Sequence, residues 1–216
     1  INVVGIEYAL SDGRVLLSDV SFRVGEGSKV ALIGPNGSGK TTLFRMIAGD
    51  ITADSGQIII NGGLGVMRQF IGSIRDESTV RDLLISVSPL RIRQAAQKLK
   101  EAESEMEANN SERQQMAYAQ ALADWGDAGG YEQEVLWDIA VNNALAKSFD
   151  RVSDRLVNSL SGGEQKKLVL EVLLSGPEEV LILDEPDNYL DVPAKRWLEE
   201  QIRISKKTIL FISHDR

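Results

Sequence analysis

The sequence has no cysteine and only one histidine among its 216 residues. Without thiols the chain can form no disulfide, no cysteine-ligated zinc site and no cysteine nucleophile. Its longest apolar runs are the length of a β-strand, far below the roughly 18 residues of a membrane-spanning helix. We therefore expect no membrane span and no signal peptide, and the lack of cysteine fits a reducing compartment, so we expect a cytoplasmic protein.

Positive charge is also scarce, because the sequence has 24 lysine and arginine residues against 32 aspartate and glutamate residues, which gives a net charge of −8. This balance argues against a surface that binds nucleic acid throughout, although it leaves room for a local basic patch. The apolar share of 43% and the charged share of 26% are typical of a globular domain.

Three regions differ in their patterns. Residues 1–70 contain short β patterns separated by turns, with one helix at about residues 40–48 that Gly49 should stop. Residues 71–160 have an almost entirely helical pattern. Residues 161–216 alternate helices with short apolar strands, which predicts a parallel sheet covered by helices.

The middle region contains a narrow apolar seam on one helix at about residues 89–108. The seam repeats at alternating spacings of three and four and consists of Ile92, Ala95, Leu99, Ala102 and Met106. Ser111 and Gln114 then predict a capping box that starts a second helix. We expect either a hairpin arm of two antiparallel helices at about residues 88–126 or an ordinary helical subdomain. Basic residues gather in the first half of the arm, although a solvated helix of mixed charge would also contain them.

Residues 34–42 read GPNGSGKTT and lie between an apolar strand and a helix, which is the context of a phosphate-binding loop. The glycines let the backbone wrap phosphate groups, and the helix N-terminus adds positive potential. Lys40 should contact the β- and γ-phosphates, and the Thr41 hydroxyl should bind Mg²⁺. The candidate nucleotide-binding residues here are Gly34, Asn36, Gly37, Ser38, Gly39, Lys40, Thr41 and Thr42.

Residues 180–186 read VLILDEP, an apolar strand with two acids at its C-terminal end. Ligands of open parallel sheets bind at that end of the strands. Asp184 should therefore hold Mg²⁺ through its water shell, and Glu185 should orient an attacking water or accept its proton.

Residues 159–167 read SLSGGEQKK, in which Ser161 and Glu164 form a capping box. Gly162 and Gly163 inside the helix cost about 1 kcal/mol each relative to alanine, and a cap does not need them. They make sense where a phosphate approaches the backbone. The string LSGGEQ lies between the motifs at 34–42 and 180–186, and it resembles the signature of the ATP-binding cassette (ABC) superfamily. In that superfamily the signature contacts ATP held by a partner domain.

This resemblance covers essentially the whole chain and implies its fold. The expected fold is one α/β ABC nucleotide-binding domain over residues 1–216 with a RecA-like P-loop core. Residues 1–70 would supply an antiparallel β subdomain and the P-loop part of the core. Residues 71–160 would form a helical subdomain with the inserted hairpin, and residues 161–216 would hold the signature helix and the rest of the core.

The resemblance also implies roles for residues outside these motifs. Gln69 looks like the Q-loop glutamine that contacts Mg²⁺ and the attacking water, and His214 looks like the switch histidine that contacts the γ-phosphate. The catalytic set would then be Lys40, Gln69, Glu185 and His214. Tyr8 is a candidate for stacking on adenine, or else it simply packs within its strand.

Two features resemble the ABC-F subfamily. Gln69 and Ser161 lie 92 positions apart, which leaves room for an arm, and DEPDNYLD is similar to the subfamily's usual DEPTNHLD, with Asp187 and Tyr189 as departures. ABC-F proteins carry two cassettes in one chain, bind the ribosome near the tRNA exit site, and act as translation or antibiotic-resistance factors.

The resemblance therefore implies an ATPase that uses ATP and Mg²⁺, is weak alone, and pairs head-to-tail with a second cassette, with ribosome and tRNA as partners. On this basis we expect the sequence to be an N-terminal cassette of a longer protein. One alternative is the ATP-binding subunit of an ABC membrane transporter with transmembrane partners. Another is an ATP-gated clamp with negligible turnover.

Overall fold

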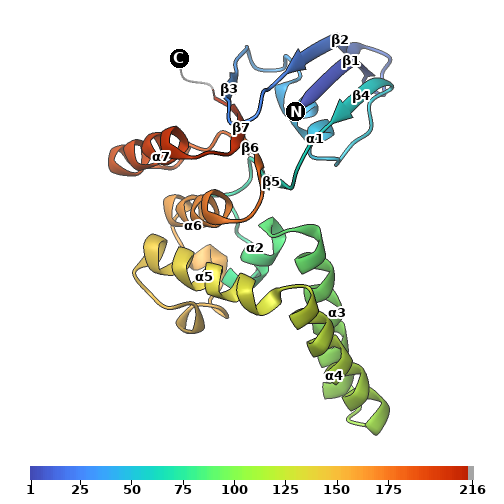
Figure 1. The fold of residues 1–216 in the computed structure, drawn as a ribbon, viewed down its shortest axis with the longest axis vertical. Helices are drawn as coiled ribbons and strands as arrows, with labels where there is room; N and C mark the ends of the chain where they lie inside the picture. Colours follow the sequence, from blue (N-terminus) through green and yellow to red (C-terminus); the bar gives the residue numbers. More distant parts are fainter. Residues whose placement is uncertain (214–216) are drawn as a thin grey trace. The chain divides into compact units, whose positions relative to one another are not determined.

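The computed structural model describes residues 1–213, which form two compact units. The first unit is built from residues 1–74 together with the chain from residue 161 onward, and the second from residues 75–160 (Figure 1). No helix among the described residues is long and apolar enough to cross a membrane.

The first unit contains a three-stranded antiparallel sheet in the order β2-β1-β4. Its strands are β1 (Asn2–Ala9), β2 (Val15–Arg23) and β4 (Ser55–Ile59). Val3, Ile6 and Leu17 are buried, and they join one hydrophobic cluster with helix α1 (Lys40–Ile47). This sheet confirms the antiparallel β part of the predicted fold.

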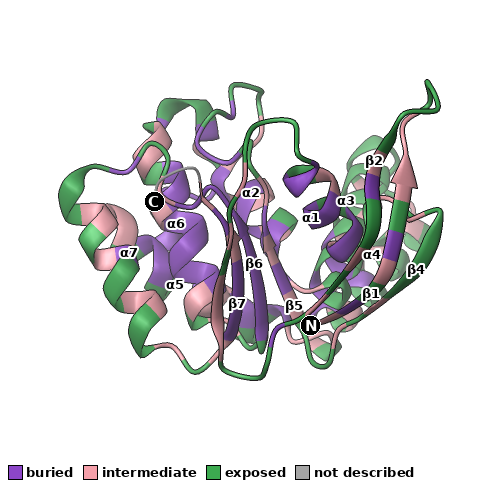
Figure 2. Cartoon of the chain, turned by 90° about the horizontal axis from the view of Figure 1, so that it is seen from above, coloured by how far each residue is buried: buried purple, intermediate pink, exposed green. Residues whose placement is uncertain are grey.

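The same unit contains a four-stranded parallel sheet in the order β3-β7-β6-β5. Its strands are β3 (Lys29–Leu32), β5 (Leu64–Met67), β6 (Val180–Asp184) and β7 (Thr208–Ile212). Helices α6 (Gly162–Ser175) and α7 (Val192–Ile204) alternate with β6 and β7 along the chain. Every residue of β6 is buried (Figure 2), as a strand with both faces covered requires. The alternation of helices and apolar strands thus predicted this layer correctly.

Helix α1 ends where the sequence predicts. Gly49 has φ +80°, a left-handed conformation that favours glycine. Its N–H donates to the carbonyl of Met46 at 3.0 Å, and the N–H of Asp50 donates to that of Arg45 at 2.8 Å. This pattern is a Schellman motif, and it satisfies carbonyls that would otherwise lack partners at the helix end.

The second unit consists mainly of helices. They are α2 (Val80–Val87), α3 (Leu90–Ala108), α4 (Glu112–Asp127) and α5 (Gly130–Leu145), with short 3₁₀ turns η1 (Phe149–Arg151) and η2 (Val157–Ser159). Helices α3 and α4 run antiparallel and pack against each other (Figure 1). Every residue of the predicted seam on α3 is buried or half-buried. The hairpin interpretation is therefore the correct one.

The predicted capping box at Ser111 is wrong in detail. Helix α4 does begin after Ser111, whose backbone is extended, but its side chain makes no capping bond to the backbone. The Ser111 hydroxyl instead contacts the side-chain oxygen of Gln114. The two side chains thus satisfy each other and leave the first N–H groups of the helix without the predicted partners.

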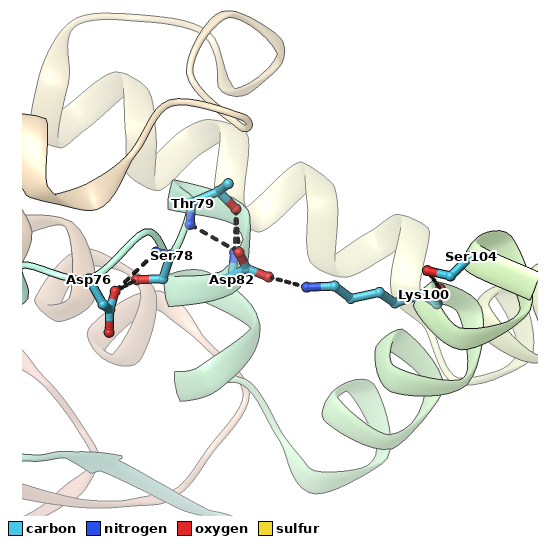
Figure 3. A network of polar contacts seen from close by, with 6 residues as sticks. All are labelled: Asp76, Ser78, Thr79, Asp82, Lys100 and Ser104. Atoms are coloured by element: carbon cyan, nitrogen blue, oxygen red, sulfur yellow. Dashed lines mark hydrogen bonds and ion pairs between the residues drawn. The ribbon is translucent and has the colours of Figure 1, made fainter. Parts of the chain in front are cut away.

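A polar network connects the base of the hairpin to α2 (Figure 3). Thr79 and Asp82 form a complete capping box at the start of α2, and the Lys100 ammonium of α3 lies 3.2 Å from Asp82. Burial raises the pKa of Asp82, but the hydrogen bonds from Thr79 and Lys100 outweigh it and hold the pKa below its usual value. The contacts that cap α2 therefore also anchor α3.

Aromatic rings form the core of the helical unit. The ring centroids of Trp125 and Trp137 are 6.2 Å apart, and those of Trp137 and Phe149 are 5.5 Å apart. Gly130, the first residue of α5, lies directly against the Trp125 indole, because a Cβ at this position would come within 2.1 Å of the ring.

Gly130→Ala should therefore lower the free energy of unfolding by about 2 kcal/mol, as expected for overpacking a core. Gly126→Ala is the matched control, since its Cβ would meet only the ring edge of Tyr131 at 3.2 Å, and Tyr131 is exposed. Because Gly126 lies within α4, alanine there should be neutral or stabilising by up to about 1 kcal/mol. Urea unfolding of both variants measures the difference, and equal midpoints would contradict the packing argument.

Candidate functional site

The candidate site lies at the carboxyl edge of the parallel sheet. Leu32 of β3 pairs with Ile212 of β7, and Ile212 pairs with Asp184 of β6. On the other side of β6, Leu183 pairs with Met67 of β5. The chain thus leaves β3, β5 and β6 at one edge, which brings together the loop at 34–39, Gln69, Asp184 and Glu185.

The loop at 34–39 is tightly wound around the Lys40 side chain. Gly37 and Gly39 have φ +79° and +89°, so both occupy left-handed conformations. A Cβ on Gly39 would also meet the Leu17 side chain at 2.7 Å. The Lys40 ammonium is buried and donates to the carbonyls of Gly34 at 2.7 Å and Pro35 at 2.9 Å. The loop therefore holds one positive group beside the N-terminus of α1, an arrangement suited to phosphate.

Glu185 has a fixed position one residue beyond β6. Its φ is +48°, in the left-handed region that a side chain with a Cβ rarely adopts, and its N–H donates to the carbonyl of Ile212 at 3.0 Å. The Gln69 amide donates to one carboxylate oxygen at 3.0 Å, and the Asn188 amide donates to the other. The two amides orient a buried carboxylate that can accept a proton or a hydrogen bond from a water.

Asp184, Thr41 and Gln69 can offer oxygen ligands to a cation. Asp184 is 2% exposed at the end of β6, Thr41 lies in the first turn of α1, and Gln69 keeps an amide oxygen besides the nitrogen that contacts Glu185. Hard oxygen donors of this kind fit Mg²⁺. Within residues 1–213 no group of three or more His, Asp or Glu side chains could hold a metal. The donor set therefore fits an ion that shares its coordination with phosphate and water.

The signature segment begins α6. The Ser161 hydroxyl accepts from the N–H of Glu164 at 3.2 Å, and the Glu164 carboxylate accepts from the N–H of Ser161 at 2.7 Å, so the predicted capping box is confirmed. A Cβ on Gly162 would come within 2.5 Å of the Gly72 carbonyl and 3.2 Å of the Tyr189 ring.

Gly163 is similarly crowded, because its Cβ would lie 3.0 Å from the Tyr189 carbonyl. Local packing therefore requires both glycines. Packing against Gly72 and Tyr189 thus explains the two glycines without a phosphate, and their contact with a nucleotide stays a prediction.

Two of the candidates stay predictions. Tyr8 is half-buried on β1, pairs with Leu17 and packs against the hydrophobic cluster, so its contacts are those of a strand residue, and stacking on adenine stays a prediction. His214 lies outside the described residues.

Lys166 and Asn188 also contact Glu185. Asn188 belongs to the string DEPDNYLD, which resembles the ABC-F subfamily, whereas the sequence pattern assigned no role to Lys166. Lys166 is fully buried, and its ammonium donates to the main-chain carbonyl of Glu185. Lys166 lies four residues before Leu170, on an apolar face of α6, and this spacing could have predicted its burial. Burial lowers the pKa of Lys166 from 10.5 to about 8, although the carboxylates of Glu185, Asp187 and Asp184 raise it.

The chain matches the protein family described as ABC transporter over residues 17–188. It is 64% identical to the antibiotic resistance protein of Mycobacteroides abscessus over 98% of this chain and 38% of that protein. It is 35% identical to the tylosin resistance ATP-binding protein TlrC of Streptomyces fradiae over 95% of this chain and 38% of that protein. The chain thus spans less than half the length of both relatives.

A likeness among solved structures concerns the fold alone. A bacterial Atm1-family ABC exporter solved with ATP bound superposes with a TM-score of 0.63 at 20% identity, over 99% of this chain and 34% of that chain. This similarity, together with the family match, confirms the predicted ABC fold.

The lowered pKa of Lys166 predicts how stability changes with pH. Below pH 8 the ammonium is charged in the folded and the unfolded chain, so folding bears the full cost of burying the charge. Between about pH 8 and 10.5 the unfolded chain binds a proton that the folded chain has released, so the free energy of unfolding rises. Relative to Lys166→Met, the wild type should gain about 2 kcal/mol between about pH 7.5 and 10. Urea unfolding at the two pH values measures this gain, and a constant difference would refute it.

Proposed function

The chain belongs to the ABC transporter family, and on that premise we propose that it binds ATP and Mg²⁺ at the carboxyl edge of its parallel sheet and hydrolyses ATP when paired with a second cassette. The observation that carries this proposal is the pairing of Gln69 with Glu185 at 3.0 Å, at the edge where the Lys40 loop leaves β3. On this proposal, phosphate binding and activation of water take place at the same edge of the sheet.

Each residue has a distinct part in the proposed reaction. The Lys40 ammonium and the N–H groups of the loop bind the phosphates and offset the charge that develops on them. Gln69 orients the attacking water, and Glu185 accepts its proton. Thr41, Asp184 and Gln69 would hold Mg²⁺, which supplies electrophilic stabilisation of the phosphoryl group when bound. His214 would contact the γ-phosphate.

ABC cassettes work as dimers, and the signature segment supports a head-to-tail pair. Ser161, Gly162, Gly163 and Glu164 form the first turn of α6 and its cap, where N–H groups and the helix dipole favour an anion. In the proposed pair this turn faces the nucleotide of the other cassette. A single copy would then provide half of each site and hydrolyse ATP slowly.

We further propose that the protein is a ribosome-associated factor of the ABC-F type that acts in translation or antibiotic resistance. Two relatives whose names denote antibiotic resistance support it, one of them 64% identical. The α3–α4 hairpin also supports it, because ABC-F proteins carry an arm at this place, between the segments that correspond to Gln69 and Ser161. Such a role would place the protein in the cytoplasm.

Lys40→Ala should weaken ATP binding about 100-fold while the fold persists, because the ammonium makes charge-assisted bonds to phosphate. Lys147→Ala is the matched control, since Lys147 is exposed in the helical unit. Calorimetric titration with ATP and Mg²⁺ measures the affinity of both variants. Unchanged affinity in Lys40→Ala would refute the phosphate-binding loop.

Shortening the hairpin should weaken ribosome association without loss of ATP binding. Ile92, Ala95 and Trp125 are buried, so the excision must spare the base of the hairpin. The Lys98 ammonium lies 3.8 Å from Asp124, which shows that the helices face each other there. Replacing residues 101–120 with a short Gly/Ser link therefore has a small closure cost.

The test uses the two-cassette protein with the Glu185→Gln substitution, which should retain ATP. Two forms of it, one complete and one lacking residues 101–120, are sedimented with ribosomes in the presence of ATP. Reduced co-sedimentation of the shortened protein supports the arm as a ribosome contact, and equal co-sedimentation rejects it. If neither protein co-sediments, the ribosome role fails and a transporter subunit becomes the better interpretation.

A further inference from the structure

We propose that Lys166 is a positioning residue that holds the peptide of Glu185 in place and thereby joins the signature helix to the hydrolytic centre of the same chain. The inference rests on the proposed function, because it assumes that Glu185 activates the water. Lys166 directly follows the signature string LSGGEQ, and the resemblance to that signature assigns it no role.

The burial of Lys166 calls for a reason. Its side chain has 0% exposure, and a fully buried lysine is rare unless its ammonium has partners. The ammonium contacts the main-chain carbonyl of Glu185 and lies 5.8 Å from the centre of the Tyr189 ring. Both partners belong to the turn after β6, so the interactions of Lys166 are directed at that turn.

The surrounding charges favour a cation at this position. The carboxylates of Glu185, Asp187 and Asp184 all act on Lys166 in the direction of the charged form. Asp187 also forms an ion pair with Lys195, whose ammonium lies 3.5 Å from the Asp187 carboxylate. Replacing Lys166 by an apolar side chain would thus leave several carboxylates near one another without their buried cation.

The turn that Lys166 contacts is strained. Glu185 and Tyr189 have φ +48° and +68°, and a residue with a side chain in this region costs about 1–3 kcal/mol unless its surroundings hold it. The Glu185 carbonyl accepts from the Asn188 N–H at 3.3 Å as well as from Lys166. Since the same residue carries the carboxylate that meets Gln69, a shift of its peptide would move the carboxylate away from the water it activates.

The position of Lys166 on α6 gives the contact a further consequence. Lys166 lies within one turn of Gly163, and the Tyr189 ring packs against Gly162 and Gly72. A displacement of the first turn of α6 would therefore act on Glu185 through one short rigid segment. In a head-to-tail pair, contact of the first turn of α6 with the other cassette's nucleotide would therefore change the position of Glu185 and the rate at which its own cassette hydrolyses ATP.

Lys166→Met tests the inference in the two-cassette protein, with Lys167→Met as the matched control. Lys167 is the next residue, and its ammonium lies over Trp197 rather than Tyr189. Lys166→Met should lower the single-turnover rate of ATP hydrolysis at least tenfold and change the Kd for ATP less than twofold. Lys167→Met should leave both values within twofold of wild type.

The double variant with Glu185→Gln separates positioning from other roles. If Lys166 acts through Glu185, Lys166→Met should lower the rate less than twofold in the Glu185→Gln background. A full tenfold loss there overturns the proposal, as does an unchanged rate in Lys166→Met alone. A loss of ATP affinity and thermal stability in proportion to the rate also overturns it, because that result indicates a structural role.

Lys166→Gln is the second variant, in case Lys166→Met does not fold. Its side chain is shorter and uncharged, so its hydrogen bond to the Glu185 carbonyl should be weaker, and the rate should fall without loss of ATP affinity. A wild-type rate would again refute the proposal. Failure of the proposed function gives a different result, since Glu185→Gln alone would then hydrolyse ATP like wild type.

Discussion

The candidate site depends on the register of four parallel strands. Because Leu32, Ile212 and Asp184 lie side by side across β3, β7 and β6, the segments that follow these strands are positioned by main-chain hydrogen bonds rather than by their own sequences. A shift of one residue in any pair would turn the side chains of that strand to the other face. The loop at 34–39 and Glu185 thus share one rigid support.

Several interactions hold Glu185 in one position at the end of β6. Its backbone conformation is unfavourable, its N–H and carbonyl are both bonded, and amides from Gln69 and Asn188 meet its carboxylate. Strain held by many partners is typical of a functional residue, since flexibility at such a position would spread the carboxylate over many orientations. The neighbouring glycines at 72 and 162 allow this close packing, because side chains there would collide with Tyr189.

Much of this arrangement could be predicted from the sequence, for physical reasons that differ by element. Helix and strand periodicity are local, so the seam on α3, the stop at Gly49 and the buried strand at 180–184 followed from the pattern. Contacts between segments that are distant in the sequence could not be predicted from the pattern. Nothing local in residues 159–167 indicates that Tyr189 packs on Gly162, or that the Lys166 ammonium meets a carbonyl beyond the next strand. The Ser111 cap failed because a side-chain partner competed with the backbone.

The order of the strands has a consequence for synthesis of the chain. Strands β7 and β6 lie between β3 and β5, yet they are translated after both of them and after the whole helical unit. While the chain grows from its N-terminus, β3 and β5 have no neighbour in their sheet until residues 180–212 emerge. Pairing over such long separations is slow and leaves apolar edges exposed. The late arrival of the two central strands therefore means that the loop at 34–39 gains its support only near the end of synthesis of the described residues.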